Sequence, residues 1–204
     1  ITYIELANDF QWNPKLTSVS QSEIENQSRN IINNYLTANL GTFDQSFRRS
    51  VLLTQLDNSD ASILSSKTNV KLQQRLLPDT SLTKDYSLVF PTVIATPTTS
   101  MDVLSSTTFT YNGKQGYLKN RNNSTTIDII SVETGKALIS NIGSISTDTG
   151  EVKLVGFSPS AYVGNYLKIS IVPSDESAIT PVRNNILEYD SQSSITRAVL
   201  TDSL

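Results

Sequence analysis

Between residues 107 and 157 the sequence is broken into short apolar runs by turn-forming residues. The runs fall within residues 107–111, 115–119, 125–132, 136–142 and 152–157. The clearest break is Asn112-Gly113, because both residues tolerate the positive φ that a type I′ hairpin turn requires at its two central positions. Short strands that recur at such spacing between glycine turns are typical of a β meander or sandwich. We therefore predict a β-rich body for this part of the chain.

The N-terminal part has a different pattern, which predicts two strands. Residues 1–6 alternate aliphatic and polar side chains, as in a short half-buried strand. Residues 62–77 form a longer candidate strand that ends before Pro78. Trp12 and Pro14 are expected in the connection that follows the first strand.

Two amphipathic helices are expected between these strands. Residues 20–23, Ser-Gln-Ser-Glu, fit a capping box, and the helix that they open is expected to end at Gly41. Asp44 is the expected N-cap of a second helix whose apolar stripe ends at Leu56. The order β-α-α-β predicts a small helix-plus-sheet layer, so the predicted fold class is α+β with a β-rich body after this layer.

The C-terminal quarter is expected to tie one body to another. Residues 152–157 and 167–172 are predicted to form a pair of strands. The segment 181–189 follows them and is called the strap below; its first residue, Pro181, favours an extended backbone. Arginine and amide side chains can bond to exposed backbone groups of a partner, and arginine is enriched at interfaces. The candidate subunit-interface residues are Pro181, Arg183, Asn184, Asn185 and Ile186, with a plain surface turn as the alternative.

Three segments follow from these patterns. Residues 1–80 form the α+β layer with two helices, and residues 81–190 form the β-rich domain with the strap. Residues 191–204 form a polar tail, which is either a disordered end or a segment that folds against a partner. The chain starts with Ile1 rather than Met, so we expect it to be a fragment or a trimmed chain.

Composition narrows the possible functions. The sequence has no Cys and no His, which excludes disulfides, Ser-His-Asp and Cys-His nucleophiles, and zinc sites built on those residues. The formal charge of −3 gives no electrostatic attraction to nucleic acid. No apolar run approaches the roughly 20 residues that a membrane-spanning helix needs. We expect no catalytic residue, no metal, no cofactor, no nucleic acid and no membrane.

Three other interpretations stay open at this stage. Residues 57–60, Asp-Asn-Ser-Asp, could bind calcium, although such residues also favour a helix end and turn. A glycosidase would need a carboxylate pair, and the candidates beside turns are Asp128, Glu133, Asp148, Glu151, Asp175 and Glu176. A carbohydrate-binding or adhesin-like β domain could use the aromatic residues Tyr111, Tyr117 and Tyr162.

Three stretches together resemble a known family. Residues 47–64 resemble its helix-then-strand unit, residues 150–154 (Gly-Glu-Val-Lys-Leu) its late strand, and residues 179–187 its closing segment. The family is the large wedge subunit of contractile phage tail baseplates, similar to gene product six of T-even phages and to baseplate J-like proteins. The resemblance spans residues 20–189, as the C-terminal part of a longer subunit.

This resemblance implies a structural role. Such subunits link wedges into a ring around the tail hub and relay baseplate rearrangement to sheath contraction. The resemblance implies a non-enzymatic virion protein of the tail baseplate, assembled in the host cytoplasm. Its expected partners are a second copy, as a dimer within the ring, and other baseplate wedge proteins.

Overall fold

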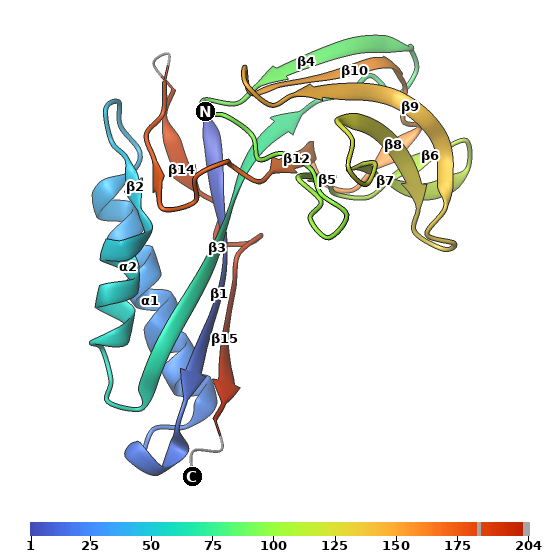
Figure 1. Cartoon of the computed structure of the whole chain (residues 1–204). Helices are drawn as coiled ribbons and strands as arrows, with labels where there is room; N and C mark the ends of the chain where they lie inside the picture. The colour runs from blue at the N-terminus through green and yellow to red at the C-terminus, as the bar shows by residue number, and fades with distance from the viewer. Residues whose placement is uncertain (183–184, 202–204) are drawn as a thin grey trace. The chain divides into compact units, whose positions relative to one another are not determined.

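The computed structural model describes residues 1–182 and 185–201 and divides the chain into two compact units (Figure 1). The N-terminal unit consists of residues 3–71 and the chain from residue 176 on, and the β unit of residues 72–175. The units differ from the segments expected from the sequence, because the chain after residue 175 returns to the N-terminal unit. The α+β class with a β-rich body is confirmed. None of the described helices is long and apolar enough to cross a membrane.

The sheet of the N-terminal unit is built around β1 (Thr2–Trp12). β1 is flanked by β3 (Ile63–Leu76) and by β14 (Leu187–Tyr189) and β15 (Ile195–Leu200). β15 runs parallel to β1, with Ala7 opposite Ile195 and Trp12 opposite Leu200. β1 is longer than the predicted strand 1–6 and includes Trp12, because the alternation of buried and less buried side chains continues to that residue.

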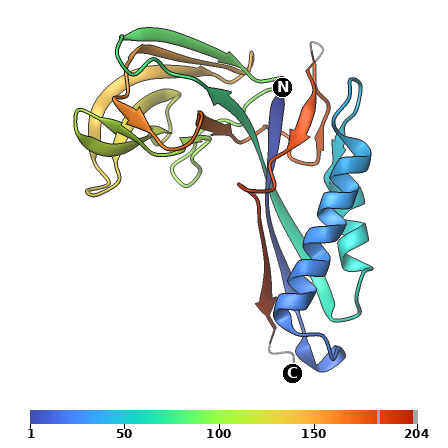
Figure 2. The same cartoon turned by 180° about the vertical axis from the view of Figure 1, so that it is seen from behind.

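Two helices cover one face of this sheet, α1 (Gln21–Asn39) and α2 (Arg49–Asp57), as both views show (Figures 1 and 2). A single 3₁₀ turn (Pro14–Leu16) precedes α1. The serine half of the predicted capping box is confirmed, since the Ser20 side chain accepts a hydrogen bond from the Glu23 backbone N–H at 3.4 Å. The predicted N-cap of α2 at Asp44 is wrong. Asp44 has a φ of 63°, so it belongs to a turn, and α2 begins five residues later.

The N-terminal unit has a core that joins the helix, the sheet and the last strand. Phe10 and Trp12 of β1 pack with Ile24 of α1, Ile63 of β3 and Ala198 of β15, all of them buried. Burial of a large apolar side chain contributes about 1.5–3 kcal/mol. The C-terminal strand is therefore part of this hydrophobic core.

The β unit is a long antiparallel meander with shorter strands at its sides. Its strands after β3 are β4 (Lys84–Val89), β5 (Leu104–Ser106), β6 (Phe109–Tyr111), β7 (Lys114–Asn120), β8 (Thr126–Ser131), β9 (Ala137–Ser146), β10 (Glu151–Phe157), β11 (Ala161–Tyr162) and β12 (Leu167–Ile171). Strands β7 to β10 pair in sequence order, which confirms the predicted meander. The predicted hairpin turn is also confirmed, since Asn112 and Gly113 have φ values of 48° and 74°.

The predicted pairing of residues 152–157 with 167–172 is wrong. β10 pairs with β9 and β4, whereas β12 pairs with β3 and β5. The connection between β10 and β12 contains β11, which pairs with β6. The chain therefore crosses to another part of the sheet between the two strands. Local apolar runs identify strands but do not identify their neighbours.

Phe157 lies at the centre of the aromatic core of the β unit. Its ring is edge-on to Phe109 at 5.1 Å and to Tyr86 at 6.2 Å between ring centroids. Phe109 and Phe157 are 1% and 0% exposed. Such edge-to-face pairs add about 0.5–1.5 kcal/mol to the effect of burial.

Candidate functional site

The chain enters the predicted strap through a short pair of strands. β13 (Ala178–Ile179) pairs antiparallel with β2 (Phe47–Arg48), and the Arg49 N–H donates to the Ser177 carbonyl at 2.9 Å. Both apolar members of the pair are buried, with Phe47 0% and Ile179 1% exposed. This strand pair fixes the beginning of the strap next to the N-terminus of α2.

Tyr35 connects that strand pair to α1. Its hydroxyl donates to the Arg48 carbonyl at 2.9 Å and accepts from the Arg48 N–H at 3.1 Å. Its ring also meets Phe47 edge-on at 6.2 Å. One buried tyrosine thus satisfies both backbone groups of a residue in a two-residue strand.

Glu176 joins the same segment to β3. Its Oε2 accepts from the Val70 N–H at 2.7 Å and lies 3.6 Å from Nη1 of Arg49. The same Nη1 donates to the Thr68 carbonyl at 3.3 Å. Both charged side chains are about a third exposed, so we expect the bond to the backbone to matter more than the ion pair.

Asp190 forms the turn between β14 and β15. Its N–H donates to the Ile4 carbonyl of β1 at 3.0 Å. Its Oδ1 accepts from the Gln192 and Ser193 N–H groups, each at 3.2 Å, and its Oδ2 accepts from the Ser193 hydroxyl at 3.0 Å. This residue is only 4% exposed, and these bonds satisfy its buried carboxylate.

Ser194 hydrogen-bonds to β1 at the position where this turn interrupts the strand pairing. Its hydroxyl accepts from the Leu6 N–H at 2.9 Å and donates to the Asp190 carbonyl at 2.8 Å. A side chain therefore replaces a missing strand hydrogen bond. Within the segment predicted to be a polar tail, residues 191–201 contain this turn and β15, both bonded to β1 of the same chain.

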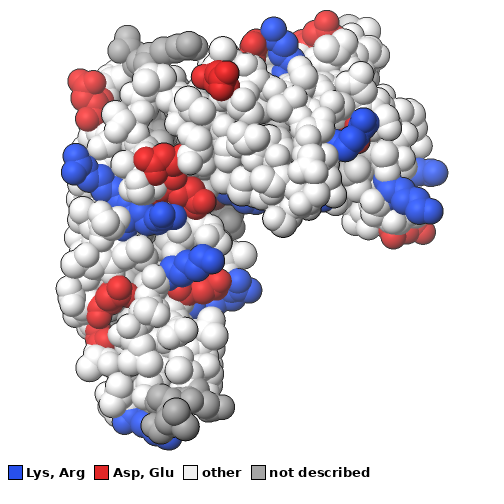
Figure 3. Space-filling model, in the orientation of Figure 1, with Lys and Arg blue, Asp and Glu red and all other residues white. Residues whose placement is uncertain are grey.

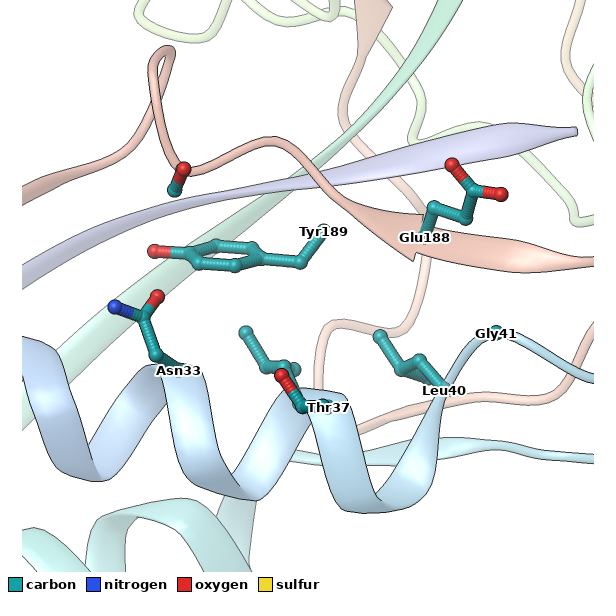
Figure 4. Close-up of a pocket in the computed structure, with 8 residues that line it drawn as sticks. Asn33, Thr37, Leu40, Gly41, Glu188 and Tyr189 are labelled. Atoms are coloured by element: carbon teal, nitrogen blue, oxygen red, sulfur yellow. The ribbon is translucent and has the colours of Figure 1, made fainter.

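A groove of about 460 Å³ lies between α1 and β14 (Figure 4). Tyr189 lies over the helix beside Asn33 and Thr37, and the Gly41 N–H donates to the Leu187 carbonyl at 2.9 Å where the helix ends. Burial raises the pKa of the Tyr189 hydroxyl. A hydrogen bond with Ser194 lowers this pKa, and the negative charge of Asp190 raises it, so the net shift is upward. Tyr189 thus stays neutral and serves as a packing and hydrogen-bonding group.

The candidate interface residues of the strap lie between β13 and β14. Pro181, Asn185 and Ile186 are half-buried, and the neighbouring Val182 is 51% exposed. The Asn185 side chain donates to the Val182 carbonyl at 3.2 Å. The other two candidates, Arg183 and Asn184, lie outside the described residues.

The predicted calcium ligands of residues 57–60 have structural contacts. Asp57 ends α2, and Asp60 Oδ1 accepts hydrogen bonds from both the N–H and the hydroxyl of Ser62, at 2.8 and 2.6 Å. This is the turn that leads into β3. Within residues 1–182 and 185–201, no group of three or more acidic side chains is arranged to bind a metal ion.

Asp128 and Glu151 were two of the carboxylates considered for a glycosidase. Each of them forms hydrogen bonds or ion pairs with nearby groups of the β unit. Burial alone would raise the pKa of Asp128, but its bonds from the Arg121 side chain and the Asn141 N–H keep that pKa below its ordinary value. Glu151 accepts from the Ser87 hydroxyl at 2.7 Å and lies 3.2 Å from the Lys153 amine. These contacts hold the strands of the meander together.

The three tyrosines considered for carbohydrate binding lie on three strands. Tyr111 is on β6, Tyr162 on β11, and Tyr117 on β7. Tyr117 lines a hollow of about 320 Å³ together with Lys119, Arg121 and Asp128. Tyr111 and Tyr162 do not line that hollow.

The charged side chains on the face shown in Figure 3 are of mixed sign. Lys and Arg lie next to Asp and Glu over this face. Among the described residues, Arg197 is paired with Asp9 at 3.0 Å and Lys84 with Asp79 at 2.7 Å. This face therefore presents no extended field of one sign that would attract a polyanion.

Residues 1–75 match a protein-family model described as baseplate structural protein gp6, C-terminal domain III. Over these residues the resemblance to the T-even gp6 family is confirmed. No curated protein matches the chain significantly. The matched stretch contains β1, both helices, β2 and nearly all of β3. The match supports a role as a structural protein of the phage tail baseplate.

The gp6 match ends at residue 75, shortly after the β unit begins at residue 72. It includes the first of the three resembling stretches, residues 47–64, while residues 150–154 and 179–187 lie outside it. The gp6-like region is nevertheless completed in space by the C-terminal segment, which adds β13, β14 and β15 to the N-terminal unit.

Sequence analysis missed the residues that hold this segment in place. A candidate carboxylate, Glu176, proved to be a backbone anchor, and Asp190 and Ser194 were assigned to no role. For Asp190 and Ser194 the sequence does contain a local signal. An Asp followed by serines three and four residues later is the pattern of a side-chain-capped turn.

Proposed function

We propose that this chain is a subunit of the baseplate wedge that links wedges into a ring around the tail hub and relays baseplate rearrangement to sheath contraction. The observation that supports it is the gp6 domain match over residues 1–75, combined with a C-terminal segment that completes the same unit. In this proposal the protein is non-enzymatic, assembles in the host cytoplasm, and contacts a second copy and other wedge proteins.

The strap is the proposed contact surface. It is held at both ends, by β13 against β2 and by Asp190 against β1, while Val182 between them is half exposed. Because these two anchored ends are already in place, ordering them adds no further entropy cost when the strap binds a partner. Pro181, Arg183, Asn184, Asn185 and Ile186 remain the proposed interface residues.

Replacing Arg183 and Asn184 with alanine is expected to weaken self-association by about tenfold or more, as loss of a central interface contact does. Association would be measured by light scattering over a wide concentration range, with circular dichroism to show an unchanged fold. The matched control is Lys136→Ala with Asn122→Ala in the β unit. If the strap variant associates as the wild type does, the strap is not the contact surface.

A further inference from the structure

β15 is an edge strand of the sheet in the N-terminal unit. Among the described strands, β1 is its one neighbour. The Thr201 N–H points to β1 and donates to the Trp12 carbonyl at 3.0 Å. Because backbone groups alternate in direction along a strand, those of Thr196 and Ala198 point away from β1. Free backbone groups on an edge strand are a template for the addition of another strand.

Side chains of α1 bond to these outward-pointing groups. Glu25 Oε1 accepts from the Ala198 N–H at 2.9 Å, and Gln21 Nε2 donates to the Ala198 carbonyl at 3.3 Å. Arg29 Nη2 donates to the Thr196 carbonyl at 3.5 Å. One acceptor and two donors thus supply what the backbone of an adjacent strand would supply.

The three helical residues form one stripe, because they are four residues apart on α1. They also bond to one another, with Gln21 Nε2 and Arg29 Nη2 each 3.4 Å from an oxygen of Glu25. The facing residues of β15 have short side chains and are nearly buried, with Thr196 6% and Ala198 9% exposed. Short side chains at these positions let the helix come close enough to reach the strand edge.

We propose that Gln21, Glu25 and Arg29 close the β15 edge against strand addition, and that they exclude the same edge of a second copy of this chain. Antiparallel pairing of two identical edges is self-complementary, which makes a second copy the best-fitting strand. Ile195 and Val199 are 52% and 48% exposed and would add apolar contacts to such a pair. This inference does not depend on the proposed function.

The test replaces Gln21, Glu25 and Arg29 together with alanine, which keeps α1 helical. Light scattering over a wide concentration range should show a mass that rises with concentration, towards about twice that of the wild type under the same conditions. The matched control replaces Gln27, Asn30 and Asn34 with alanine. These three residues are exposed on the same helix, so the control should behave as the wild type. A triple variant with the mass of the wild type at every concentration overturns the proposal.

A single-residue experiment keeps the proposal testable should the triple variant fail to fold. In Glu25→Ala the Ala198 amide loses its acceptor, and its hydrogen exchange should accelerate by about tenfold or more. Glu25→Gln retains a carbonyl acceptor and should keep most of the protection. Equal exchange at Ala198 in the wild type and in Glu25→Ala would contradict closure of the edge by this stripe.

Discussion

Replacing Phe47 with alanine should lower the free energy of unfolding by about 3–5 kcal/mol, the usual cost of removing a fully buried phenylalanine side chain. Phe47 is 0% exposed and sits in β2, opposite Ile179 of β13. Its ring also meets Tyr35 of α1 edge-on at 6.2 Å. The substitution would therefore leave a cavity where the helix, the short strand pair and the start of the strap meet.

The matched control for this prediction is Phe43→Ala. Phe43 lies four residues earlier and is 57% exposed, so its loss should change the free energy of unfolding by no more than about 0.5 kcal/mol. Urea unfolding followed by circular dichroism measures both variants. Equal effects of the two substitutions would mean that Phe47 does not anchor the strap as described.

Replacing Gly150 with alanine should destabilise the β unit by several kcal/mol, since overpacking alone costs about 1–3 kcal/mol and the backbone adds strain. Gly150 has a φ of 71°, and a Cβ there would lie 2.5 Å from the Thr92 carbonyl oxygen and 2.6 Å from that of Phe90. The glycine also bonds to the neighbouring segment, because the Phe90 N–H donates to its carbonyl at 2.8 Å. The two carbonyls belong to the backbone of this bonded segment, so they cannot move away as the end of a flexible side chain would.

Gly135→Ala is the control that separates backbone strain from the close contact of the added Cβ with the two carbonyls. Gly135 has a similar φ of 66°, but no atom lies within 4 Å of the added Cβ, so only backbone strain of about 1 kcal/mol is expected. Thermal unfolding of both variants should therefore show a much larger decrease in melting temperature for Gly150→Ala. Similar decreases would show that the close approach of the two carbonyls is not what requires glycine at position 150.

Sequence patterns predicted most elements of this fold because those elements depend on local chemistry. The Ser20 cap needs only the residues of one helical turn, and the Asn112-Gly113 turn needs two residues that accept positive φ. Asp44 shows the limit of such signals. It has the side chain of a helix cap but adopts the φ of a turn, and α2 begins elsewhere.

The partners of the strands and the route of the C-terminal segment depend on contacts distant in sequence. Nothing local to Ile195 or Val199 indicates that β15 pairs in parallel with β1, nearly the whole chain away. Likewise, Glu176 has the appearance of an ordinary surface carboxylate until its bond with the Val70 N–H is known. The residues that close the β15 edge are also polar positions on a helix, and only the fold places a strand edge beside them.

The most direct test of the baseplate assignment is site-specific photo-crosslinking in assembled phage tails. A photo-reactive amino acid would replace Val182, which is 51% exposed within the proposed contact surface, and Val163, which is 80% exposed in the β unit, would be the control position. We expect position 182 to give a covalent adduct with a second copy or with another baseplate wedge protein, at a higher yield than position 163. Absence of the chain from purified baseplates, or its presence with no adduct at position 182, would contradict the account.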